Sequence, residues 1–206
     1  IDLHERHGRV DEALAAARRM VETNADSALP RLRLADIQRR TGQSEEARKT
    51  LVDAADRLSG DARLEVRRAL AASLLLDGKR KEAVEVLRAL ASETPSDAEA
   101  RVSLLSLPEV RQNEAEGLRL VAELKGIEGE FGVRWKLEQA RLWVEGASWR
   151  SRQAETIELL QACLRADSGW EGPSLVLAAV DERIGNFREA EQTLRAAMPN
   201  NPTAPN

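Results

Sequence analysis

The chain of 206 residues is poor in the residue types on which many functional sites depend. Its single cysteine, Cys163, excludes an intramolecular disulfide. Its two histidines, His4 and His7, lie three residues apart and lack the further ligands that a zinc site requires. A cysteine nucleophile needs a neighbouring base, and both histidines lie at the other end of the chain. We therefore predict no catalytic residue, no metal and no cofactor, and we expect Cys163 to be a buried structural thiol.

Long apolar runs and a strong net charge are also missing. No run approaches the roughly 20 apolar residues that span a membrane, and no signal-peptide pattern is present. The net charge of −4 is too small for general attraction to nucleic acid or to a membrane surface. We predict no nucleic-acid partner and no direct membrane insertion. The chain is expected to be soluble, and its compartment, cytoplasmic or periplasmic, stays open.

What the chain does contain is an internal repeat. A glycine is followed four residues later by the pair Glu-Ala, and this pattern returns after 34 and then 36 residues and again near the end of the chain. The clear copies run over residues 8–13, 42–47, 78–83 and 185–190, and weaker copies run over 110–115 and 151–156.

Each part of the repeat has a physical reason. The glycine ends one helix and supplies a turn position with positive φ. The alanine five residues later lets the next helix lie close to the first. Apolar residues then follow at helical spacing, as at Val84, Leu87 and Leu90. Pro95 and Pro202, each 17 residues after its glycine, are predicted to stop their helices.

This pattern resembles the tetratricopeptide repeat. Leu-Ala pairs precede the glycines at the family's first-helix position, at 34–35, 70–71 and 177–178. The chain departs from the family where a large residue is usual, because it has Arg31, Arg67 and Ser174 there, and it has no tyrosine. The resemblance implies an all-α, right-handed superhelical solenoid of antiparallel helix pairs.

The whole chain, residues 1–206, is predicted to be a single array of about five to six repeats. Because Ile1 stands in mid-pattern and another repeat would begin near Pro202, we expect an array truncated at both ends, whose exposed repeat ends could self-associate. A loop or hinge is expected over 125–130 and a long turn over 147–150. The predicted helices run over 1–24 (a helix stub and a full helix), 27–41, 44–59, 61–77, 80–94, 97–106, 109–125, 131–147, 151–167, 172–184 and 187–198.

The inner, concave face of such an array is the first candidate binding surface. Its predicted residues include Arg33, Asp36, Arg40, Arg68 and Arg101. Three of these arginines recur about once per repeat, and arginine binds carboxylates in a bidentate manner, so we predict an acidic peptide or chain terminus as the partner. The alternative is scattered surface arginine in an arginine-rich chain, with Asp36 partly neutralising the row.

Four tryptophans form the second candidate surface, because tryptophan is enriched in binding hot spots. Trp135 and Trp143 stand in a predicted helix, whereas Trp149 and Trp170 stand in predicted turns. Either the tryptophans pack in the core of an irregular repeat, or the two in turns contact a partner.

We hypothesise a scaffold for protein–protein interaction that binds a peptide or helix in its concave groove without catalysis. The alternative is an architectural spacer in a larger bacterial assembly, such as an envelope or polysaccharide-export complex. The net charge, and the absence of a regular base-reading pair in each repeat, argue against a reader of nucleic acid. Some family members hold chaperone tails with a Lys/Asn clamp, but the matching positions here are Leu32 and Asp36.

Overall fold

The computed structural model describes residues 9–197 and forms two compact units, Ile1–Ala100 and Arg101–Asn206. Predictions that concern His4, His7, Gly8 and Pro202 fall outside the described residues. The prediction of a single array over 1–206 stays a prediction.

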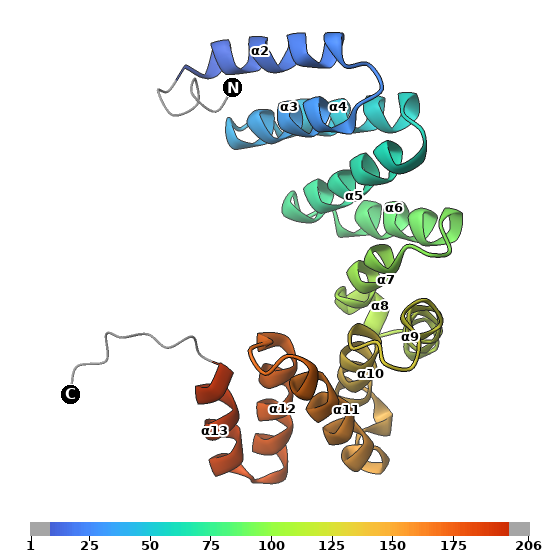
Figure 1. Ribbon diagram of the computed structural model, residues 1–206, viewed down its shortest axis with the longest axis vertical. Helices are drawn as coiled ribbons and strands as arrows, with labels where there is room; N and C mark the ends of the chain where they lie inside the picture. Colours follow the sequence, from blue (N-terminus) through green and yellow to red (C-terminus); the bar gives the residue numbers. More distant parts are fainter. Residues whose placement is uncertain (1–8, 198–206) are drawn as a thin grey trace, which may run out of the picture. The chain divides into compact units, whose positions relative to one another are not determined.

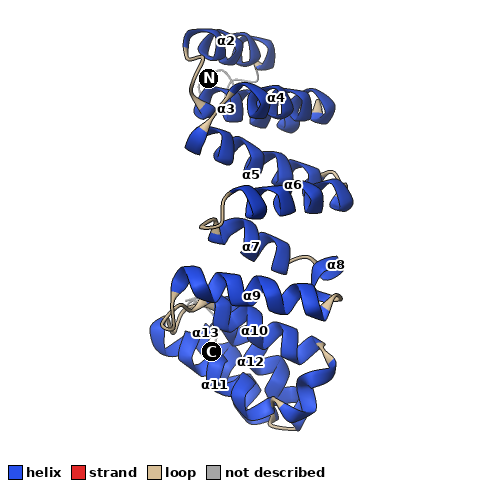
Figure 2. Cartoon of the chain, turned by 90° about the vertical axis from the view of Figure 1, so that its right-hand side faces the viewer, coloured by secondary structure: helices blue, strands red, loops and turns tan. Residues whose placement is uncertain are grey.

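The first unit contains only helices among its described residues, joined by short loops (Figures 1 and 2). From α2 to α6 each helix packs against the next one, and α3 also packs against α5. The two complete pairs are α3 with α4 and α5 with α6. The helices are α2 (Val10–Thr23), α3 (Ala28–Arg40), α4 (Ser44–Arg57), α5 (Gly60–Leu76), α6 (Arg80–Glu93) and α7 (Ala98–Leu105), the last of which continues into the second unit.

The second unit is also helical throughout its described residues. Its helices α10 and α12 pack against each other, as α3 and α5 do in the first unit. Its elements are α8 (Pro108–Arg111), α9 (Glu114–Glu128), α10 (Arg134–Glu145), a 3₁₀ turn (Ala147–Ser151), α11 (Gln153–Ala166), α12 (Glu171–Ile184) and α13 (Phe187–Ala197). The all-α fold of antiparallel helix pairs is thus confirmed.

The repeated glycine makes the turn inside each clear pair. Gly42, Gly78 and Gly185 have φ of +80°, +73° and +89°. At Gly78, the amide N–H donates to the carbonyl of Leu75, and the N–H of Lys79 donates to the carbonyl of Leu74 over 2.8 Å. Equivalent bonds form at the other two glycines, so all three pairs use the same Schellman ending.

The repeated alanine is buried in each clear copy of the repeat. Ala13, Ala47, Ala83 and Ala190 are at most 2% exposed. A larger side chain there would push the two helices of a pair apart. Burial of this alanine, which the predicted close packing requires, is found in both units.

Two predicted elements were wrong. The helix expected over 109–125 is divided into α8 and α9, because the Asn113 side chain accepts a bond from the Glu116 N–H and begins a new helix. The hinge expected over 125–130 is mostly helix: Gly126 lies inside α9, which ends at Glu128 and is followed by Gly129, with φ of +74°.

Candidate functional site

The first unit has an apolar groove between its two complete pairs. The groove has a volume of about 330 Å³, and small side chains form much of its wall. Leu76 at one edge is 69% exposed. We call it the α3–α5 groove, and it is lined by Leu32, Ala35, Asp36, Arg39, Ala47, Leu51, Ala69, Ala72, Ser73 and Leu76.

Ser73 is one of the residues that line this hollow. It stands five residues before the turn glycine, where the other clear pairs have Ile37 and Val180. Those two side chains are 2% and 0% exposed, so both are buried. The Ser73 side chain is smaller, and its buried Oγ has no hydrogen-bond partner among the described residues. A short polar side chain therefore stands where the repeat elsewhere has a branched apolar one.

The charged groups at the groove are paired with each other. Asp36 Oδ1 lies 3.2 Å from the guanidinium of Arg39, and Asp36 Oδ2 lies 3.1 Å from that of Arg40. Each of these side chains is about two-fifths to one-half exposed, so the pairs contribute little to stability and can exchange for a partner's groups. The groove thus offers an apolar floor and one mixed-charge edge.

The predicted arginine row does not form. Arg33 stands nine residues before Gly42, but Arg68 stands ten before Gly78, so the two occupy different faces of their helices. Arg33 is exposed, whereas Arg68 lies 2.9 Å from the buried carboxylate of Asp97.

Arg101 departs most clearly from its predicted role as a partner-binding residue. It is only 4% exposed, and its Nε donates to Glu123 over 2.9 Å, so it is not an exposed partner contact in this structure. Of the predicted partner-binding residues, the α3–α5 groove contains only Asp36. The prediction of an acidic partner therefore lacks the exposed row on which it depended.

Three of the four tryptophans, Trp135, Trp149 and Trp170, lie in or against the core of the second unit. Trp149 is 5% exposed and belongs to the same cluster as Leu160 and Cys163, which excludes it as an exposed anchor. Trp170 is partly buried against that cluster. Arg183 lies 4.8 Å from the ring centroid of Trp149. Of the two alternatives, core packing and partner contact, core packing applies to Trp149.

Cys163 is a buried thiol with 0% exposure, as expected. Its Sγ lies 3.3 Å from the carbonyl oxygen of Val133, to which the thiol donates. Burial raises the pKa of Cys163 to about 11, so the thiol stays protonated at neutral pH and is a poor nucleophile.

The second unit has a larger and more polar hollow between α10 and α12, with a volume of about 520 Å³. Its charged groups already have partners inside the unit. Arg111 bonds to Glu145 over 2.8 Å, and Arg141 bonds to the buried Glu138 over 2.7 Å. Because these pairs occupy the polar wall, this hollow is a weaker candidate than the α3–α5 groove for an apolar partner.

Across residues 9–197 no cluster of His, Cys, Asp and Glu is suited to hold a metal ion. In the same part of the chain, no helix is both long and apolar enough to cross a membrane.

Comparison with known proteins identifies the repeat. A family model described as "Tetratricopeptide repeat" matches residues 6–72, which are 67 of the 206 residues. Residues 6–72 of the chain therefore belong to the tetratricopeptide-repeat family. The matched repeats include α2, α3, α4 and most of α5, and hence three walls of the α3–α5 groove. No curated protein matches the chain in sequence.

Solved structures show the same fold over most of the chain. A tetratricopeptide repeat protein from Parabacteroides merdae matches with a TM-score of 0.70 and 17% identity, over 95% of this chain and 77% of its own. MamA from Desulfovibrio magneticus, residues 41 to the end, matches with a TM-score of 0.59 and 16% identity, over 83% and 93%. The Cut9–Hcn1 hetero-tetramer of the APC/C matches with a TM-score of 0.67 and 11% identity, over 94% of this chain and 37% of that one.

Tetratricopeptide repeats in general serve as scaffolds for protein–protein interaction, and the family is generally non-catalytic. The sequence did not single out Ser73 or the leucines that line the groove with it, Leu32, Leu51 and Leu76. Aligning the helices on the turn glycine would have found Ser73, because the same alignment places isoleucine and valine at its position.

Proposed function

We propose that this protein is an interaction module without catalytic activity, and that it binds a peptide or helix of a partner protein in the α3–α5 groove. The observation that carries the proposal is the apolar hollow of about 330 Å³ around Ser73. Binding sites for small groups are concave, mostly apolar and flanked by a few polar groups, and this groove has that composition.

The recognition element in the partner is an apolar side chain. Alanines and the three leucines Leu32, Leu51 and Leu76 form the apolar lining of the groove. An amphipathic helix places apolar side chains at intervals of three and four residues, which suits a groove between two helices. One such side chain would enter the hollow at Ser73, and a neighbouring polar group would meet the Asp36–Arg39 pair.

Ser73 supplies a test that separates binding from folding. Ser73→Ile fills the hollow with the side chain that the preceding pair has at Ile37. Ser73→Ala is the matched control, because it removes the same hydroxyl and leaves the hollow open. Both variants should fold, since neither adds a polar group or a charge to the core.

The experiment selects binding segments from a displayed peptide library on the wild-type protein and measures their affinities by calorimetry. We expect the selected segments to share an apolar anchor. Ser73→Ile should weaken their binding about tenfold or more, as loss of a central anchor does, and Ser73→Ala should leave it within about threefold. Equal binding by the wild type and Ser73→Ile would refute the groove as the binding surface.

The alternative function, an architectural spacer, predicts a different result from the same selection. A spacer with no binding groove should enrich no segment that shares an anchor. Such an outcome would favour the spacer over the interaction module.

A further inference from the structure

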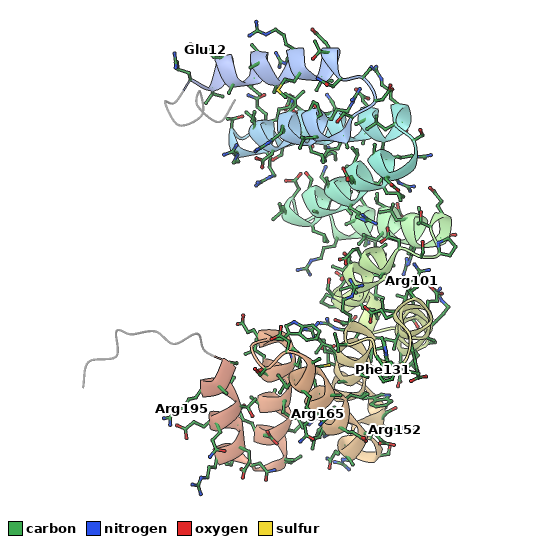
Figure 3. All side chains as sticks on the ribbon, viewed as in Figure 1. Glu12, Arg101, Phe131, Arg152, Arg165 and Arg195 are labelled. Atoms are coloured by element: carbon green, nitrogen blue, oxygen red, sulfur yellow. The ribbon has the colours of Figure 1, made fainter. Side chains whose placement is uncertain are left out.

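The connection between α9 and α10 exposes one aromatic side chain almost completely. Phe131 is 95% exposed, more than any other large apolar side chain in the described part of the chain. Figure 3 labels Phe131 beside these two helices. Full exposure of a phenyl ring leaves a large apolar area in water, and such a ring favours a site that buries it.

The backbone on both sides of Phe131 is held in place. The indole Nε1 of Trp135 donates to the carbonyl of Gly129 over 3.0 Å, and the N–H of Gly132 donates to the same residue over 3.1 Å. Lys136 Nζ donates to the carbonyl of Glu130 over 2.8 Å. The loop therefore presents its ring from a preorganised backbone, which lowers the entropy lost on binding.

Side chains around the loop reinforce this geometry. Lys125 pairs with Glu130 over 2.9 Å, and its Nζ lies 4.6 Å from the ring centroid of Trp135. Glu128 accepts a bond from the Trp135 N–H and pairs with Arg134. These contacts occupy the polar groups beside the loop, so what the loop offers to another molecule is chiefly the Phe131 ring.

A Cβ at Gly132 would meet atoms of its neighbours. It would lie 2.7 Å from Glu128 Oε2 and 2.9 Å from Trp135 Cδ1. The glycine thus permits the close approach of the loop to both side chains.

Every copy of the chain carries both this ring and an apolar hollow of suitable size. The α3–α5 groove encloses about 330 Å³. An apolar cavity of about 150 Å³ is enough to bind benzene, so the groove can accept a phenyl ring. Ser73 leaves the space open, and the small Ala69 and Ala72 add no obstruction.

We propose that Phe131 of one copy inserts into the α3–α5 groove of a second copy, so that the protein self-associates. The proposal rests on the groove being a binding site, as in the proposed function. Because the two contacting surfaces differ, each copy in a pair still has one unused ring or one unused groove. Such a heterologous contact can extend head to tail unless it closes into a ring.

Self-association and partner binding then use the same groove. A partner segment and a second copy would compete for it, so the concentration of the protein would set how much groove is available. The modest net charge of −4 opposes the approach of two copies only weakly.

The test is sedimentation velocity over a concentration series for the wild type and four variants. For the wild type, the average mass should rise with concentration. Phe131→Ala, which lacks the ring, and Ser73→Ile, which lacks the open groove, should each raise the dissociation constant about tenfold or more. Ser73→Ala should associate like the wild type.

Phe187→Ala is the matched control for Phe131→Ala, because Phe187 is the other phenylalanine and is 70% exposed at the start of α13. It should leave association unchanged. A loss of association in Phe187→Ala alone would overturn the proposal and favour contact through the last helix.

A mixture of the two defective variants gives the sharpest outcome. Phe131→Ala keeps its groove and Ser73→Ile keeps its ring, so an equimolar mixture should form pairs and nothing larger. A wild type that stays monomeric, or a Phe131→Ala variant that associates like the wild type, would overturn the inference.

Failure of this inference can be told apart from failure of the proposed function. If Phe131→Ala binds selected segments and the wild type never self-associates, only the inference fails. If Ser73→Ile neither weakens segment binding nor reduces association, both fail.

Discussion

Replacing Ser73 should stabilise the protein, and the size of the effect follows from the structure. Ser73 is 6% exposed, and its Oγ is buried without a hydrogen-bond partner among the described residues. A buried unsatisfied polar group costs about 1–3 kcal/mol, and alanine has a higher helix propensity than serine. For Ser73→Ala we expect a gain of about 1 kcal/mol in the free energy of unfolding.

Ser73→Ile should add to that gain. Relative to alanine, isoleucine carries three more carbons, each worth about 0.8 kcal/mol when buried. The lost rotamer freedom and the lower helix propensity of a β-branched residue remove roughly half of this. A total gain of about 2 kcal/mol over the wild type is expected.

Urea unfolding followed by circular dichroism measures this gain as a shift of the midpoint at constant slope. All four tryptophans lie in the second unit, whereas Ser73 lies in the first. Tryptophan fluorescence recorded in parallel therefore reports how far the effect spreads. If Ser73→Ile is less stable than Ser73→Ala, the hollow has no room for the longer side chain, and the reasoning about the groove is wrong.

Three further predictions test the fold and the core. Gly78→Ala should lower the free energy of unfolding by about 1–2 kcal/mol, because φ is +73° there although the space around the Cβ is open. Gly126→Ala, in the interior of α9, should raise the free energy of unfolding by up to about 1 kcal/mol. Equal urea midpoints for the two variants would contradict this. Burial raises the pKa of Glu138, so the folded state holds this proton more tightly than the unfolded state. Stability should then fall as pH rises from the ordinary value of 4.5 through the raised pKa, and Glu138→Gln should flatten that slope in urea titrations at several pH values. Because burial raises the pKa of Cys163 to about 11, a thiol reagent should label it only as the protein unfolds, and fast labelling of the native protein would show that the site opens.

The sequence predicted the fold well because its signals are local. The glycine at each turn needs positive φ, and the alanine after it needs close packing, so both mark the same place in every clear pair. The break at Asn113 was missed although its signal was readable. Asn113 caps the N–H of Glu116, and an asparagine followed three residues later by glutamate is a common helix start.

The candidate site was predicted less well because it depends on which face of a helix a residue occupies. One residue turns a helix by about 100°, so an error of one position moved Arg68 into the same row as Arg33. Tertiary contacts decided the rest, since Arg101 is buried against Glu123 and Trp149 lies in the core. Comparing helices by their distance from the turn glycine would have revealed both the misplaced row and Ser73.

The most direct test of the central claim is photo-crosslinking from inside the groove. A benzophenone side chain is placed at Ala72, which lines the α3–α5 groove, or at Glu85, which is exposed on α6. Each protein is then irradiated with a segment selected on the wild type. The account predicts a crosslink from position 72 and none from position 85. A crosslink from position 85, or none from position 72, would contradict it.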